Sequence, residues 1–205
     1  MHFVPVAEGT GQIEALGEFV LRRALTLGAN WPGRTIAVNI SPTQLRNPKF
    51  PDRVFDMLQQ AGMRPEDLEF EITEGILLDD EHSTTEALTR FRSAGIRIAL
   101  DDFGTGYSSL NYLKRYPVDR IKIDRSFVSQ LTEASTSTAI VQAMVTLAHA
   151  LKIKVTAEGV ETSEQFDVLA GMGCDTFQGF LLSAPLEPGA IEAMFENGPL
   201  LARVA

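Results

Sequence analysis

Two adjacent aspartates, Asp101 and Asp102, directly follow the apolar run Ile98-Ala99-Leu100. The apolar run predicts a strand of a parallel sheet that is covered on both faces. In α/β sheets and barrels, chemical groups gather where such strands end. The next turn contains Gly104 and Gly106, whose backbone freedom lets the loop fold closely over whatever the aspartates bind. The alternative is a solvated turn in which one aspartate caps the next helix.

The elements that must position these aspartates alternate regularly along the chain. Short apolar runs predict strands at residues 36–41, 68–73, 96–100, 120–124, 154–161 and 176–182. Helical patterns cover residues 13–25, 53–61, 84–93, 108–115, 139–151 and 164–171, and a tail helix begins at Gly189. Strands that alternate with helices at this spacing imply parallel pairing through right-handed crossovers. We therefore predict an α/β fold.

A polar residue lies near the end of every predicted strand, and this favours a closed barrel in which the strand ends meet on one face. The residues are Asn39, Glu71, Asp101, Asp102, Lys122, Glu158 and Gln178. Four carboxylates and two amides suit hard cations such as Mg²⁺ or Mn²⁺ rather than zinc. Two such ions about 4 Å apart support in-line attack on phosphodiesters, so phosphate ester hydrolysis is the predicted reaction. The alternative for Glu71 or Glu158 is an ion pair with Lys122.

Size, charge and cysteine content narrow the classes of protein. The chain has 205 residues, 44% of them hydrophobic, which predicts one domain over residues 1–205. A formal charge of −9 argues against a surface that binds duplex nucleic acid. Cys174 is the one cysteine of the sequence, so no intramolecular disulfide can form. The sequence has no apolar run of membrane-spanning length and no signal-peptide pattern, so a cytoplasmic location is expected.

Seven ordered motifs resemble the EAL domain family, the cyclic di-GMP phosphodiesterases of bacterial signalling. They are Phe3-Val4-Pro5-Val6-Ala7-Glu8, Val38-Asn39-Ile40-Ser41, Glu71-Ile72-Thr73-Glu74, the segment from Asp101 to Leu110, Ile121-Lys122-Ile123-Asp124, Ala157-Glu158-Gly159-Val160-Glu161 and Gln178-Gly179-Phe180. The match runs from residue 3 to about residue 186 and leaves a tail over residues 187–205. The resemblance implies a TIM-like (β/α) barrel that hydrolyses cyclic di-GMP to linear pGpG by two-metal-assisted attack of water.

The resemblance also implies a metal-binding role for five of the polar residues. Asn39, Glu71 and Asp101 would ligate a first Mg²⁺ or Mn²⁺ ion. The second ion would be ligated by Asp101, Asp102 and Glu158.

The remaining implied roles concern catalysis and substrate. Lys122, with Glu158, would be catalytic and would orient the attacking water. Gln178 would help to position the ligand. Glu74 would stabilise the loop that contains Gly104 and Gly106 through hydrogen bonds.

The naming motif of the family, Glu-Ala-Leu, lies on an early strand upstream of the segment that Phe3 begins. Glu14-Ala15-Leu16 has the same letters, but the apolar stripe of Ile13, Leu16, Val20 and Leu21 predicts an amphipathic helix there, with Glu14 on its solvent face. We interpret this three-letter match as coincidence. The resemblance thus places two strands, one metal ligand and a phosphate-contacting arginine upstream. The expected barrel is incomplete, with about six of eight strand-helix units.

Three functions follow as hypotheses. The first is a fragment of a cyclic di-GMP phosphodiesterase, which needs the upstream strands for activity. The second is a catalytically inactive EAL-type module that binds cyclic di-GMP or a protein partner, and the third is an unrelated metal-dependent barrel hydrolase. Expected partners are cyclic di-GMP, a second copy in a homodimer, and an upstream sensory or GGDEF domain in a longer protein. Unpaired strand edges and exposed helix faces would favour self-association.

Overall fold

The structure is a computed structural model, and it describes residues 6–7, 9–78, 82–106, 113, 115–116, 118–131 and 136–197. The chain divides into two compact units. The first consists of Met1–Asp101 and Gly106–Arg120, and the second of Asp102–Thr105 and Ile121–Ala205. Most of the predicted helix 108–115, and most of the motif that begins at Phe3, lie outside the described residues.

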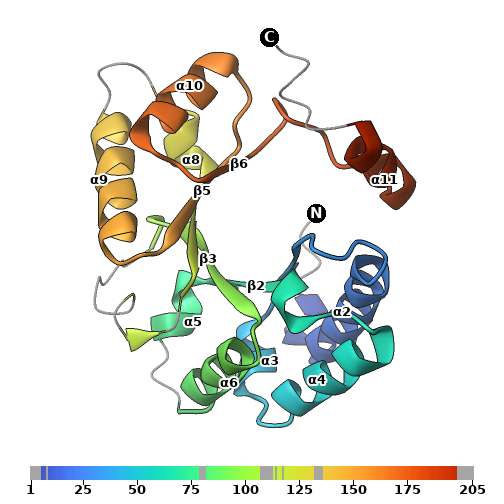
Figure 1. Cartoon of the computed structure of the whole chain (residues 1–205). Coiled ribbons are helices and arrows are strands. Elements are labelled where there is room, and N and C mark those ends of the chain that lie inside the picture. The colour runs from blue at the N-terminus through green and yellow to red at the C-terminus, as the bar shows by residue number, and fades with distance from the viewer. Residues whose placement is uncertain are drawn as a thin grey trace. The chain divides into compact units, whose positions relative to one another are not determined.

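All six predicted strands are present (Figure 1). They are β1 (Ile36–Asn39), β2 (Leu68–Thr73), β3 (Arg97–Phe103), β4 (Arg120–Ile123), β5 (Lys154–Glu158) and β6 (Thr176–Gln178). Their order in the sheet is their order in the sequence. Parallel pairing joins β1 to β2, β2 to β3, and β5 to β6. This arrangement confirms the predicted α/β fold.

The helices agree with the prediction where the apolar pattern is long. The described helices are α2 (Ile13–Gly28), α3 (Pro42–Arg46), α4 (Phe50–Ala61), the 3-10 helix η1 (Pro65–Asp67), α5 (Glu74–Leu78), α6 (His82–Ser93), α8 (Arg125–Val128), α9 (Thr136–Ala150), α10 (Ser163–Met172) and α11 (Pro188–Asn197). The short helices α3, α5 and α8 were not predicted, because each is too short to show a helical period. Of the helices described, none is long and apolar enough to cross a membrane.

Three phenylalanines form the centre of the core of the first unit. Phe50 of α4, Phe70 of β2 and Phe91 of α6 are each at most 3% exposed. The Phe70 and Phe91 ring centroids lie 4.9 Å apart with the rings tilted edge to face, and those of Phe50 and Phe91 lie 5.8 Å apart. Edge-to-face contacts of this kind add to the free energy gained from burial alone. They hold α4 and α6, which lie side by side in Figure 1, against β2.

Helix α2 packs differently from the prediction on one flank. Ile13 and Leu21 are buried as expected, but Val20 is 44% exposed, and Phe19 beside it is 68% exposed. Val20 and Leu16 line a cavity of about 660 Å³ instead of packing against protein. The cavity is also lined by Ile13, Gly17, Asn39, Ile40, Ser41, Pro42, Gln44 and Thr73. The predicted apolar stripe is thus only partly buried, because Val20 belongs to it and is exposed. The expected self-association stays a prediction.

The second unit is built around strand β5. Val155, Ala157 and Val160 are fully buried, and so is Ile123 at the end of β4. Helices α8 and α9 both contact β5. A capping box formed by Thr162 begins α10, because its hydroxyl and the Gln165 side chain satisfy N–H groups that a helix start leaves without partners. Strand β5, which ends at Glu158, is thus held by its contacts with α8 and α9.

Candidate metal and substrate site

In the first unit, three predicted ligands lie on the same face of the sheet. Asn39 and Glu71 are register partners in β1 and β2, and Asn39 Nδ2 donates a hydrogen bond of 3.2 Å to Glu71 Oε2. Glu71 pairs with Ala99 in β3, and Asp101 follows Ala99 by two residues. Side chains alternate along a strand, so Asp101 is on the same face as Glu71. Glu71 is buried, Asp101 is half-buried and Asn39 is exposed.

In the second unit, the predicted catalytic residues form an ion pair. Lys122 Nζ lies 2.7 Å from Glu158 Oε1, and the two side chains are 6% and 17% exposed. Glu158 and Gln178 are register partners in β5 and β6, so their side chains share a face of the sheet. The structure therefore brings together Lys122, Glu158 and Gln178. It also contains the ion pair that the sequence left open as an alternative.

Asp102 adds a second carboxylate beside Glu158. One carboxylate oxygen of Asp102 lies within 4.8 Å of one from Glu158. The backbone of Asp102 is left-handed, with φ of 53°, a conformation that aspartate tolerates better than most residues. Asp101 precedes it, with its Cα about 3.8 Å from that of Asp102 across the peptide bond. Converging carboxylate oxygens are the donors that hard divalent cations prefer, so these residues fit such an ion.

The two loop glycines lie against different neighbours. A Cβ on Gly106 would lie 2.8 Å from Glu74 Oε2, so the Glu74 carboxylate already lies beside the loop. Gly104 has φ of 96°, and a Cβ there would lie 3.1 Å from the Phe127 ring and would clash with Met144 of α9. Side chains at either position would thus push the loop away. The predicted hydrogen bonds from Glu74 to the loop stay a prediction.

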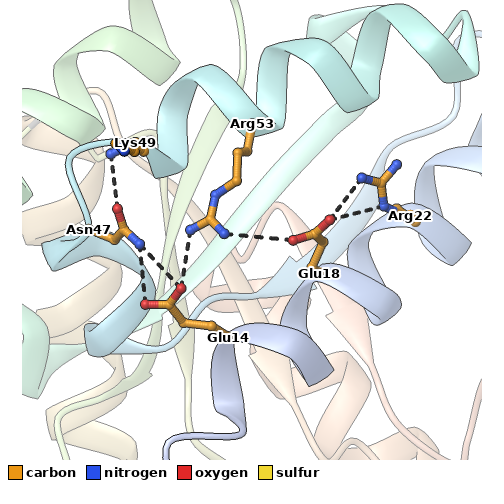
Figure 2. Close-up of polar contacts among 6 residues, drawn as sticks. All are labelled: Glu14, Glu18, Arg22, Asn47, Lys49 and Arg53. Carbon is orange, nitrogen blue, oxygen red and sulfur yellow. Dashed lines mark hydrogen bonds and ion pairs between the residues drawn. The ribbon is translucent and has the colours of Figure 1, made fainter.

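Glu14 differs from its predicted position on the solvent face. Its side chain is 37% exposed and takes part in a polar cluster between α2, the C-cap residue of α3 and helix α4. Figure 2 shows Asn47 Nδ2 donating to both Glu14 oxygens at 3.2 Å, and Arg53 donating to Oε2 at 3.3 Å. The helical period predicts a face of the helix, not the partners that reach it from other elements. These contacts support the interpretation that Glu14-Ala15-Leu16 is a coincidental match.

Two kinds of residue near the site were not singled out from the sequence. Asp124 caps α8 by accepting a hydrogen bond of 2.9 Å from the Ser126 N–H. Burial acts to raise the pKa of Asp124, but the hydrogen bonds from Ser126 lower it below its ordinary value.

Gly159 and Gly179 are the second kind. Each directly follows a predicted site residue in the sequence, and this adjacency is the signal by which they could have been singled out.

Comparisons with known proteins give the chain its family. The model of the EAL domain matches residues 1–185. MucR of Pseudomonas aeruginosa, a bifunctional diguanylate cyclase/cyclic di-GMP phosphodiesterase, is 41% identical over 189 residues, which are 90% of this chain and 28% of MucR. An uncharacterized signaling protein of Caulobacter vibrioides is 48% identical over 193 residues, which are 93% of this chain and 24% of that protein. The chain thus spans about a quarter of the length of these relatives.

Solved structures agree with the sequence comparisons. The structure of the MucR phosphodiesterase in complex with c-di-GMP is similar with a TM-score of 0.87 at 40% identity, covering 92% of this chain and 84% of that one. The manganese and c-di-GMP complex of Klebsiella pneumoniae BlrP1 has a TM-score of 0.78 at 34% identity, covering 83% of this chain and 44% of that one.

These similarities decide two of the sequence predictions. With six described strands in sequence order, they confirm the predicted fold class, an incomplete TIM-like (β/α) barrel. They also show that the hypothesis of an unrelated barrel hydrolase is wrong. The family model covers residues 1–185 of the 205, so this chain belongs to the EAL domain family.

Proposed function

We propose that this chain is part of a cyclic di-GMP phosphodiesterase that hydrolyses cyclic di-GMP to linear pGpG. The observation that carries the proposal is the buried Lys122 ammonium at 2.7 Å from Glu158, whose carboxylate lies beside that of Asp102. A buried amine next to converging carboxylates is an arrangement suited to phosphate chemistry. The phosphodiesterase activity in the name of MucR and the c-di-GMP in its structure support the choice of substrate.

We infer that two Mg²⁺ or Mn²⁺ ions are the cofactors. Asn39, Glu71 and Asp101 would hold one ion, and Asp101, Asp102 and Glu158 the other. The support is the oxygen chemistry of these donors and the manganese named in the BlrP1 complex. When bound, such ions lower the pKa of a coordinated water and stabilise negative charge on the phosphate.

The protein's own side chains would orient the reactants. The Lys122 ammonium would donate hydrogen bonds to the attacking water and to a phosphate oxygen, because its partner Glu158 fixes its direction. The Gln178 amide, on the same sheet face as Glu158, would hold the ligand. Glu74, beside Gly106, would keep the loop in place.

The proposal extends to the whole protein. Residues 1–205 would form a single partial EAL domain of a longer cytoplasmic signalling protein, with a sensory or GGDEF domain upstream and with homodimers as one assembly state. The diguanylate cyclase activity in the name of MucR, of which this chain spans 28%, supports the presence of a further domain.

The test measures conversion of cyclic di-GMP to pGpG by chromatography, for this chain and for a version extended upstream, with Mg²⁺ or Mn²⁺. Calorimetry on the same samples measures cyclic di-GMP binding. Glu158→Gln should abolish hydrolysis, and Glu187→Gln, on an exposed loop, is the matched control. Binding without hydrolysis by the extended version would favour the catalytically inactive module. The proposal would be refuted if both versions failed to bind cyclic di-GMP and failed to hydrolyse it.

A further inference from the structure

We propose that Gly159 and Gly179 are positioning residues of this site. Each directly follows a site residue, Glu158 or Gln178, and each lies where a neighbouring segment comes too close for a Cβ atom. The proposed role is to let these segments pack closely against the ends of the strands. Glu158 and Gln178 then keep the positions that metal binding needs. The inference rests on the proposed function for the identity of the site and adds the packing that holds it.

Gly159 lies against the start of helix α8. A Cβ on Gly159 would lie 2.5 Å from the Cβ of Arg125 and 3.3 Å from its Cα. Real Cβ atoms essentially never come within 3.0 Å of another heavy atom in this way, so one of the two backbones would have to move. Gly159 also has φ of 67°, where a side chain adds strain. Helix α8 follows β4, the strand that contains Lys122, so this contact joins the ends of β4 and β5.

Gly179 lies against the backbone of Val160. A Cβ there would lie 2.7 Å from the Val160 carbonyl carbon and closer still to its nitrogen and oxygen. The Val160 N–H donates to the Gln178 carbonyl at 3.0 Å, and the Leu181 N–H donates to the Val160 carbonyl at 3.0 Å. Val160 itself is fully buried and cannot yield towards solvent. This contact therefore joins the ends of β5 and β6.

The two contacts enclose the site residues of the second unit. Glu158 and Gln178 are register partners, and Glu158 pairs with Lys122 at 2.7 Å. A methyl group at Gly159 or Gly179 would displace the strand end beside it, because atoms of Arg125 or Val160 already occupy the space that it needs. A misplacement of about 1 Å in a catalytic group can reduce the rate roughly 100-fold. The expected result is a folded protein whose metal site is out of position.

Different atoms occupy the space that a Cβ would need at Gly159 and at Gly179. The two glycine variants should therefore respond differently to the same second substitution. At Gly159 the nearest atom belongs to a side chain, so Arg125→Gly removes it. At Gly179 the obstacle is the backbone of Val160, which no substitution removes. Arg125→Gly should therefore restore part of the Mn²⁺ affinity that Gly159→Ala loses, because the strain of a side chain at φ of 67° remains. It should leave Gly179→Ala unchanged, and a double-mutant cycle isolates this coupling.

The experiment compares Gly159→Ala and Gly179→Ala, each with and without Arg125→Gly, with the parent chain. Gly171→Ala in α10 is the matched control, because a Cβ there meets nothing within 4 Å. Electron paramagnetic resonance measures Mn²⁺ affinity, thermal unfolding measures stability, and hydrogen exchange follows the Val160 and Leu181 amides. We expect each site variant to weaken Mn²⁺ binding at least tenfold at a temperature where it is folded. Gly179→Ala should also speed exchange at both amides, and Gly171→Ala should match the parent.

Two results would overturn the inference. One is parent Mn²⁺ affinity in both glycine variants, even with a lower Tm, which would make the glycines structural only. The other is weakened Mn²⁺ binding by Gly159→Ala that Arg125→Gly does not restore even in part. If Gly179→Ala does not fold, the Gly159 series decides. If neither the parent chain nor the version extended upstream bound Mn²⁺, the proposed function would be contradicted instead. Unchanged exchange at Val160 and Leu181 in Gly179→Ala would still refute the packing.

Discussion

The buried Lys122 and the half-buried Glu158 form an ion pair, with 2.7 Å between Nζ and Oε1. Burying an ammonium costs several kcal/mol unless a carboxylate compensates, and removal of one partner leaves the other charge uncompensated. The ion pair thus contributes to the stability of the fold, whether or not its two residues also take part in catalysis. A divalent cation bound by Glu158 would offer the carboxylate a second source of positive charge, and this lets the two roles be separated.

We predict that Lys122→Ala loses about 3 kcal/mol of unfolding free energy in the presence of a chelator, because the half-buried Glu158 loses the ammonium that pairs with it. Added Mn²⁺ should restore part of this loss, since an ion that binds the folded state stabilises it. Urea denaturation with and without Mn²⁺ measures both effects. Lys154→Ala, at the exposed start of β5, is the control. Unchanged stability of Lys122→Ala in chelator would contradict the structural role.

Asp102 should contribute to metal binding without contributing much to stability. Its left-handed backbone, with φ of 53°, suits Asn and Gly but costs Ala about 1 kcal/mol. Asp102→Asn and Asp102→Gly should therefore unfold like the parent, whereas Asp102→Ala should be less stable. All three should bind Mn²⁺ at least tenfold more weakly in calorimetric titration. Parent affinity in Asp102→Asn would remove Asp102 from the proposed ligands.

Glu14 should affect stability slightly and metal binding not at all. The carboxylate accepts hydrogen bonds from Asn47 and Arg53 in the cluster of Figure 2. Because Glu14 and Arg53 are each more than one third exposed, Glu14→Gln should cost less than about 1 kcal/mol. Thermal unfolding and Mn²⁺ titration of the same sample check both points. Weaker Mn²⁺ binding by Glu14→Gln would bring Glu14-Ala15-Leu16 back as a metal-binding motif.

Low pH should lower the stability of the first unit, because the Asp67 carboxyl becomes protonated. The hydrogen-bonded Arg64 guanidinium lowers the pKa of the Asp67 carboxyl below its ordinary value, burial opposes this, and the Gly33 N–H adds to the lowering. A carboxyl with a lower pKa in the folded state stabilises the fold above its unfolded pKa of about 3.9, and this stability disappears as pH falls through the folded pKa.

As the pH is lowered from about 5 to about 2, the unfolding free energy of Asp67→Asn should therefore decrease less than that of the parent. Urea denaturation across this range measures the difference. Asp167→Asn, at an exposed position of α10, should keep the parent's pH dependence. Parallel pH profiles of parent and Asp67→Asn would show that Asp67 is not responsible.

The sequence alone determined the order of strands and the residues at their ends. The apolar runs around Phe70 and Leu100 predict buried strands because both faces of a parallel sheet are covered, and the structure has both strands. Polar side chains such as Glu71 and Glu158 stand out in these runs, because burying them has a cost that packing alone does not explain. Helices with a long apolar pattern, such as α9, were also predicted, because the spacing of apolar residues along the chain is local information.

The tertiary structure alone decided how these residues meet. A one-dimensional pattern cannot specify that Lys122 pairs with Glu158, or that Arg53 reaches Glu14 from another helix, because these distances depend on packing between elements far apart in sequence. It also cannot show that Val20 lines a cavity, because the same apolar stripe predicts burial whatever lies opposite. The left-handed backbone of Asp102 was equally invisible, since the surrounding structure must hold a residue in that conformation against its local preference.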